Sequence, residues 1–229
     1  MRYRNLLILA VLAMSFQASA EFISLDWKVA GDDRAFLQEE TGIEWLKLTE
    51  TVNMSINQVE SELVAGGLYE GWRLPDLSEV DGIFNDVLAT SPAFESQSQM
   101  TTSAVRDVVS DWVDLFGSTW AADINGDAER SYGLLKKDTD ASMFGGFFFF
   151  QGNTGNANYN RNSVDFDATI GSYGVFLVAD GGATLTTRND PSLTANNTNN
   201  TVDVAEPFVL ALLGLGIFGL IFARKRSSR

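Results

Sequence analysis

The chain has 229 residues, a formal net charge of −14, and neither cysteine nor histidine. Without cysteine no disulfide holds the fold, and without histidine the Ser-His triads and the imidazole metal sites are excluded. An acidic surface repels nucleic acid and anionic membranes, so cations are the charged partners that it attracts.

The N-terminus has the pattern of a secretory signal peptide over residues 1–20. Two arginines precede an apolar stretch at residues 6–14, and the Ala-Ser-Ala sequence at residues 18–20 is typical of a cleavage site. The apolar stretch is shorter than the roughly 20 residues that span a bilayer. We therefore expect signal peptidase to remove this segment and to release a body that begins at Glu21. A buried N-terminal helix is the alternative.

The first half of the body predicts helices after an opening strand at residues 22–29. A capping box at Ser55 starts one helix, and Asp76 with Glu79 starts another. Apolar residues at helical spacing predict a third helix over residues 103–116. We assign its Trp112, and Trp120 beyond it, to the core.

The second half predicts a sheet. Short β-prone runs alternate with Gly- and Asn-rich turns, and a run of four phenylalanines favours a strand that is buried on both sides. The expected strands are residues 132–135, 147–151, 163–166 and 173–178. Helices followed by strands favour a single α+β domain over residues 21–183. The Thr- and Asn-rich composition of residues 184–203 then predicts a flexible linker.

One acidic segment has the ligand spacing of a calcium loop. Asp123, Asn125 and Asp127 alternate, and Glu129 completes a looser candidate set. Leu134 stands where a calcium loop has its bidentate glutamate, so an acidic turn is the competing interpretation. Calcium is the only candidate cofactor.

A second segment has the residue types that hydrogen-bond sugar hydroxyls. We expect it to be a loop that either binds glycan or only connects strands. Its candidate residues are Asn153, Asn156, Asn158, Tyr159, Asn160 and Arg161.

The C-terminus has the pattern of a membrane anchor. Residues 208–223 carry no charge, and a basic cluster follows them: Arg224, Lys225 and Arg226. Ten basic residues and all 30 acids lie in residues 21–206, a net charge of −20, whereas both ends are basic. Basic flanks stay in the cytoplasm, which predicts an exported body and a transmembrane helix at about residues 207–223. A core helix or a removable lipid-anchor signal are the alternatives.

The residues before this helix are Val204, Ala205, Glu206 and Pro207. With the apolar helix and the basic cluster, they resemble the PEP-CTERM sorting signal of Gram-negative bacteria. That signal has a proline at the position of Ala205. The resemblance implies processing by an exosortase and export linked to extracellular polysaccharide.

A second motif pairs a Thr-Gly-Ile-Glu-Trp sequence ending at Trp45 with a Trp-Arg-Leu-Pro sequence. Its residues are Trp45, Trp72, Arg73, Leu74, Pro75, Asp76 and Glu79. The motif resembles that of a bacterial family of unknown function, which is similar in fold to C-type lectins and formylglycine-generating enzymes. The catalytic cysteines of those enzymes are absent. We expect the motif to be structural, with Arg73 half-buried against carbonyls or a carboxylate.

These observations predict an exported, membrane-anchored envelope or matrix protein with a C-type-lectin-like body, non-enzymatic and glycan-binding, with no nucleic-acid partner. Its partners would be signal peptidase, an exosortase and exopolysaccharide. Two alternatives stay open. One is an envelope hydrolase that uses paired carboxylates, and the other is a plain tethered spacer.

Overall fold

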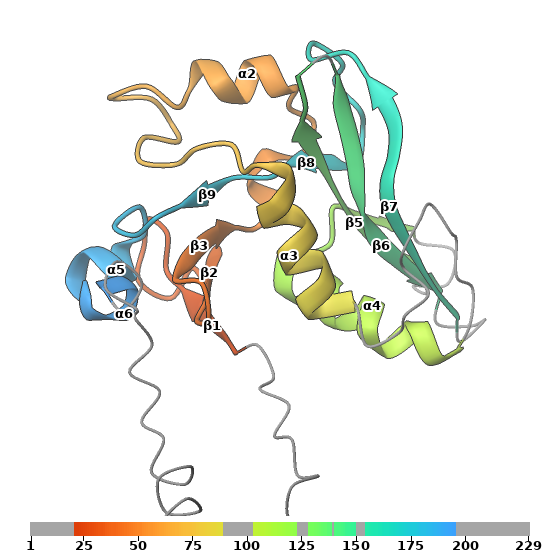
Figure 1. The fold of residues 1–229 in the computed structure, drawn as a ribbon, viewed down its shortest axis with the longest axis horizontal. Coiled ribbons are helices and arrows are strands. Elements are labelled where there is room, and N and C mark those ends of the chain that lie inside the picture. Colours follow the sequence, from red (N-terminus) through yellow and green to blue (C-terminus); the bar gives the residue numbers. More distant parts are fainter. Residues whose placement is uncertain (1–20, 89–102, 123–127, 139, 150–153, 196–229) are drawn as a thin grey trace, which may run out of the picture. The chain divides into compact units, whose positions relative to one another are not determined.

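The body combines helices with antiparallel sheets, which confirms the predicted α+β class (Figure 1). The described residues between Glu21 and Thr194 belong to one compact unit. The predicted signal peptide, sorting motif, transmembrane helix and basic cluster lie outside the described residues. The computed structural model describes residues 21–88, 103–122, 128–138, 140–149 and 154–195.

The first sheet brings the two ends of the body together. Its strands are antiparallel, in the order β1 (Phe22–Leu25), β2 (Ala35–Gln38), β3 (Ile43–Leu46) and β9 (Val178–Ala179). The opening strand is shorter than expected because the Asp32 carboxylate accepts hydrogen bonds from the backbone N–H groups of Trp27, Lys28 and Val29, which close a turn.

The helices follow the predicted caps. A short 3₁₀ helix, η1 (Leu48–Thr51), precedes α2 (Ile56–Ser61), whose capping box at Ser55 is confirmed. At α3 (Leu77–Leu88), Asp76 accepts from the Glu79 N–H, and Glu79 accepts in return from the Asp76 N–H, which confirms the second box. The third predicted helix is α4 (Ser103–Phe116).

The second sheet has five strands, four of them in the order β4 (Trp120–Ala122), β5 (Ala128–Lys136), β6 (Ala141–Phe149) and β7 (Thr154–Val164). A further strand, β8 (Tyr173–Val175), pairs in parallel with β5 beside β4. β7 overturns one expectation, because the Asn-rich segment after β6 is an 11-residue strand and not a loop. Its side chains are therefore fixed by the register of the sheet.

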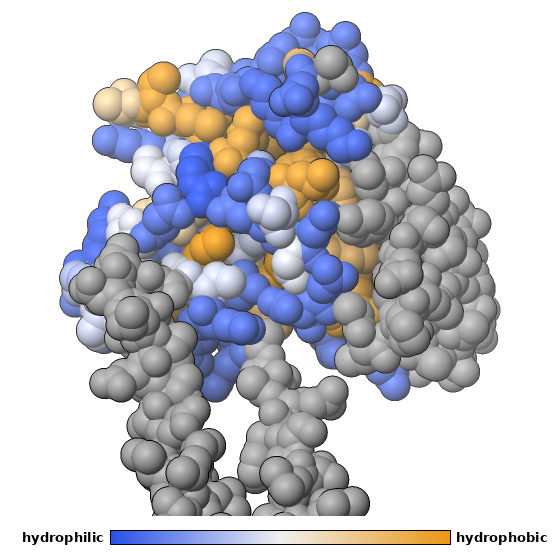
Figure 2. Space-filling view, in the orientation of Figure 1, coloured by the Kyte–Doolittle hydropathy of each residue, from blue (hydrophilic) through white to orange (hydrophobic). Residues whose placement is uncertain are grey.

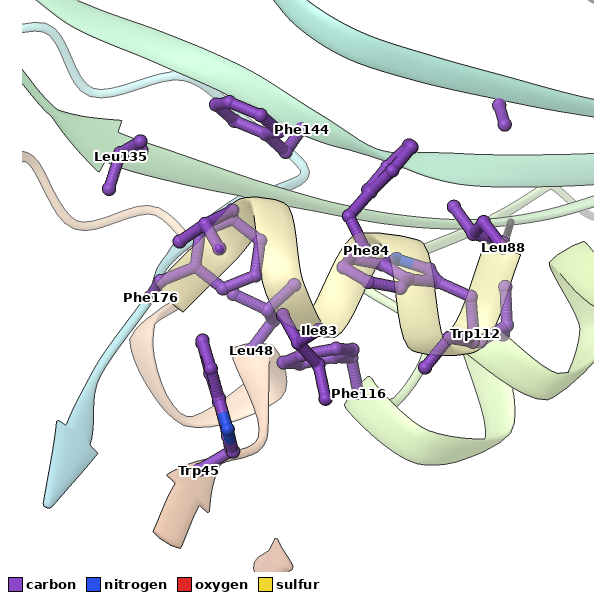
Figure 3. Packing of buried hydrophobic residues seen from close by; sticks show 14 of the residues in the cluster. Trp45, Leu48, Ile83, Phe84, Leu88, Trp112, Phe116, Leu135, Phe144 and Phe176 are labelled. Atoms are coloured by element: carbon purple, nitrogen blue, oxygen red, sulfur yellow. The ribbon is translucent and has the colours of Figure 1, made fainter. Parts of the chain in front are cut away.

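Helices α3 and α4 lie between the two sheets and share one core with both (Figure 1). Figure 3 shows Trp45 of β3, Phe116 of α4 and Phe176 turned toward one another. The Trp45 and Phe176 ring centroids lie 5.9 and 5.5 Å from that of Phe116, and both pairs pack edge to face. Trp112 is fully buried beside them, as predicted. Aromatic packing of this kind supplies the core that disulfides do not.

The predicted linker is wrong at its beginning. Thr184 caps α5 (Leu185–Asn189), and α6 (Ser192–Ala195) follows. The Thr184 and Thr187 side chains are buried, and the N–H of Leu185 donates to the Asp26 carbonyl oxygen at 2.8 Å. A Thr-rich composition suggested a solvated segment, but the Thr184 and Thr187 hydroxyl groups are buried and hydrogen-bonded at the start of α5.

Within the described ranges, which leave out both termini, no helix has the length and hydropathy that crossing a membrane requires.

Candidate functional site

The second sheet has two different faces. Its inner face packs on α4: the indole Nε1–H of Trp112 donates to the Ser131 carbonyl oxygen at 3.0 Å, and Leu135, Phe144 and Ala157 lie in the shared core. Side chains alternate along a strand, so Arg130, Tyr132 and Leu134 lie on the opposite face, which we call the outer face. On it Leu134 packs among buried apolar side chains, Tyr132 is 5% exposed and Arg130 is partly exposed. The candidate site lies on this outer face.

Six residues form what we call the sheet-face cluster. Directly opposed residues share a face, and the register aligns Trp120 with Arg130, and Tyr132 with Gly145 and Asn158. Asn156 shares this face because it lies opposite Phe147, the partner of Arg130. The cluster is made of Trp120, Arg130, Tyr132, Asn156, Asn158 and Tyr173.

Aromatic rings surround the guanidinium group at the centre of the cluster. The Arg130 Cζ atom lies 4.5 Å from the centroid of the Trp120 ring and 5.3 Å from that of Tyr132. Tyr132 and Tyr173 pack edge to face at 5.4 Å. Burial raises the pKa of Tyr173, although the charge of Arg130 opposes this. A cation held against π faces presents a fixed, planar set of N–H donors.

The amide groups come from β7. The Asn158 Nδ2 atom donates to the Tyr132 hydroxyl oxygen at 2.8 Å, which links the second and fourth strands of the sheet across β6. Asn156 is only 9% exposed, and its Oδ1 atom has no hydrogen-bond partner among the described residues. A buried amide oxygen without a donor costs free energy, and the atom is enclosed within the sheet face.

Gly145 makes room for this arrangement. Its φ is +147°, and a Cβ atom there would lie 2.1 Å from the Ser131 carbonyl oxygen and 2.7 Å from Cδ1 of Tyr132. Only glycine accepts both the conformation and the close approach of the ring. The glycine therefore lets the Tyr132 ring lie over β6 and reach Asn158.

Of the predicted glycan residues, the structure brings Asn156 and Asn158 to the cluster. Tyr159, Asn160 and Arg161 lie in β7, and Asn153 lies outside the described residues. Sequence reasoning missed Arg130, Tyr132 and Tyr173. It also placed Trp120 in the core, whereas the residue is partly exposed and stacks on Arg130. The Arg-Ser-Tyr alternation in β5 was the available signal, but its outward direction depends on the sheet register.

The Trp-Arg-Leu-Pro motif makes its contacts within the body. The Arg73 guanidinium binds both Glu79 oxygens at 2.8 and 2.6 Å and Asp180 at 2.6 Å, and its backbone pairs with Val178. Hydrogen bonds from Arg73 hold the pKa of Asp180 below its usual value. The residue therefore ties the start of α3 to the end of β9. Trp72 is buried, and Leu74 packs against a second group of buried apolar side chains, which includes Trp27, Leu46 and Trp72.

The carboxylate of Glu44 is also held by contacts within the body. Glu44 is completely buried and accepts hydrogen bonds from the backbone N–H groups of Gly182, Ala183 and Thr184 at 2.9 to 3.2 Å. Burial raises its pKa, and the hydrogen bonds from Thr187 and the three N–H groups oppose the rise. These donors hold the carboxylate in the turn before α5.

The candidate calcium segment falls mostly outside the described residues, which include only Glu129. That residue lies in β5 opposite Ala121 and Phe148. In the part of the chain that the structure describes, no three acidic side chains gather closely enough to hold a metal ion.

Comparison of the chain with protein-family models, with curated proteins and with solved structures gives no significant match.

Proposed function

We propose that the protein is an exported, membrane-anchored envelope protein with a C-type-lectin-like body that binds glycan through the sheet-face cluster, without catalysis. The observation that carries the proposal is the sheet face of Arg130, where partly exposed Trp120 lies against the guanidinium group and partly exposed Tyr173 packs edge to face on Tyr132. Aromatic faces with fixed amide and guanidinium groups offer the apolar and polar contacts that a sugar ring needs.

The pattern of both termini supports the location. A signal-peptide pattern, a body of net charge −20 and an anchor pattern with a basic end fit export with the body outside the cytoplasm. Recognition of Val204–Pro207 by an exosortase would connect the protein to exopolysaccharide. Calcium remains a candidate through Asp123, Asn125 and Asp127, so its contribution belongs in the test.

The test is a glycan array with the full chain in mild detergent, with calcium and with a chelator. We expect retention of at least one polysaccharide and at least a tenfold weaker signal for Arg130→Gln and for Trp120→Ala. Arg34→Gln is the matched control, because Arg34 pairs with Glu50 at 3.1 Å outside the cluster. Absence of glycan binding under both conditions, or equal binding by all variants, would remove the proposed role of the cluster.

A further inference from the structure

A pocket of about 240 Å³ lies outside the sheet-face cluster, against the turn that follows β1. Trp27 and Lys28 form one wall, the turn at residues 66–68 forms another, and Glu70 and Arg188 complete the lining with Ala183. The volume suits a ligand the size of one sugar or one amino acid, because drug-sized ligands occupy about 300 Å³ or more.

The aromatic wall of the pocket is held in place. Trp27 is 5% exposed and stacks on Tyr69 with ring centroids 5.8 Å apart and planes within 9°. Trp72 packs edge-on against the same indole at 6.3 Å. The Tyr69 hydroxyl donates to the Glu50 carbonyl oxygen at 2.7 Å, and burial raises its pKa to about 12. A preformed wall lowers the ordering cost of binding.

Two cations line the pocket, and neither forms an ion pair with a described carboxylate. The Lys28 Nζ atom lies 3.9 Å from the Trp27 ring centroid and donates to the Leu68 carbonyl oxygen at 3.2 Å. Arg188 donates through Nε to the Thr184 carbonyl oxygen at 3.1 Å and through Nη2 to that of Trp27 at 3.4 Å. Carbonyl groups therefore position both cations without neutralising them.

The carboxylates around the pocket are held by backbone N–H groups. Glu70 accepts from Gly66 at 2.9 Å, and Glu62 accepts from Leu68 at 2.9 Å. Asp32 accepts from Trp27 and its neighbours in the turn, and these hydrogen bonds together lower its pKa despite the opposing effect of burial. The lining residues themselves, Lys28 and Arg188 with Glu70, carry a net charge of +1, whereas Glu62 and Asp32 lie outside the lining. That charge suits a carboxylate better than a phosphate with nearly two negative charges.

An exposed apolar side chain lies at the pocket. Leu68 lines it and is 49% exposed, and Val64, four residues earlier in the same loop, is 59% exposed. Figure 2 shows hydrophobic residues at the tip of the loop that follows α2. A ligand without apolar atoms would leave this apolar surface without a contact, so the carboxylate should belong to a larger organic molecule.

We infer that this pocket binds a small organic monocarboxylate, with Lys28 and Arg188 on the carboxylate and Leu68 against its organic part. The site is separate from the sheet-face cluster and does not depend on the proposed function. The carboxylate has two chemical sources, an acidic sugar or the C-terminal end of a peptide, and the experiment distinguishes them.

The test is calorimetric titration of the full chain in mild detergent with glucuronate, with N-acetylalanine and with neutral glucose. We expect one of the carboxylates to bind with a Kd of about 0.1 to 1 mM and glucose not to bind. Preference for glucuronate identifies the sugar source, and preference for N-acetylalanine identifies the peptide source. Failure of both acids to bind overturns the inference.

Variants test the assignment of the residues. Lys28→Gln with Arg188→Gln should weaken binding at least tenfold, and Lys47→Gln, which removes a positive charge outside the lining, should leave it unchanged. Arg188 also holds two carbonyl groups, so a second variant guards against unfolding. Leu68→Glu changes an exposed residue and places a like charge at the opening, and it should abolish binding while thermal unfolding stays unchanged. Wild-type affinity in both variants would contradict the assignment.

Discussion

The Asn158 amide donates to the Tyr132 hydroxyl oxygen across an intervening strand, over a glycine. The two residues lie 26 positions apart in the chain and two strands apart in the sheet, and Gly145 between them removes the side chain that would separate them. The candidate glycan site therefore depends on the geometry of β6 as much as on the residues that would touch a sugar.

Gly145→Ala should disrupt this arrangement. The added Cβ atom would lie 2.1 Å from the Ser131 carbonyl oxygen, at a φ of +147°. We expect a loss of roughly 1–3 kcal/mol in the free energy of unfolding, together with weaker glycan binding. Gly82→Ala in α3 is the matched control, since a Cβ atom there meets nothing within 4 Å. It should gain about 0.5–1 kcal/mol. Equal stabilities in urea titrations would contradict this account.

Glu44 should give the protein a distinctive pH dependence. Its pKa in the folded state lies above its ordinary value of 4.5, so the folded state holds the proton more tightly than the unfolded state. Its contribution to stability therefore falls as pH rises from 4.5 through the folded-state pKa, and it is fully present below 4.5. The stability of wild type relative to Glu44→Gln should rise when pH is lowered from 7 to 5, as measured by urea unfolding at both values. A constant difference would argue against the raised pKa.

Truncation tests whether α5 belongs to the fold. A body that ends at residue 195 should be as stable as one that includes residues up to 203. A body that ends at residue 183 loses the Thr184 N–H donor to Glu44 and the Thr186 hydroxyl group that accepts from Asp26 N–H at 2.9 Å. Removing partners from buried polar groups should cost roughly 2–4 kcal/mol. Denaturant midpoints that match for all three bodies would restore the linker interpretation.

Arg73→Ala should destabilise the body more than Arg34→Ala. Arg73 bridges Glu79 and Asp180, but its side chain is 40% exposed, so solvent screening limits the loss to about 1–2 kcal/mol. The single Arg34–Glu50 pair should contribute less than about 1 kcal/mol. Because Asp180 has a lowered pKa, its share is present above pH 3.8 and is lost as pH falls further. Chemical unfolding at pH 7 and pH 3 measures both effects.

Intact-mass spectrometry of the native protein tests sorting. We expect a mature chain that lacks residues 1–20 and the C-terminal cluster at 224–226. The same chain made in cells without an exosortase should keep the cluster and serves as the control. Native protein that retains Arg224 would refute removal of the tail, although a membrane anchor at about residues 207–223 would stay in place.

The sequence by itself determined the local features of this protein. The caps at Ser55 and Asp76 and the helical period of residues 103–116 were readable because each depends on neighbours within about four positions. The structural role of Arg73 was also predictable, since Glu79 lies one helical turn beyond the cap. The predicted export and anchoring rest on the same kind of local pattern.

Only the tertiary structure decided which side chains meet. An Asn-rich segment became β7 because β6 pairs with it, which is a non-local contact that overrides the low strand propensity of asparagine. Thr184 is a buried cap whose backbone N–H donates to the carboxylate of Glu44, 140 positions away in the chain. A buried carboxylate is stable only with such donors. The sheet-face cluster likewise depends on strand register, and a shift of one residue would turn Arg130 and Tyr132 to the face that packs on α4.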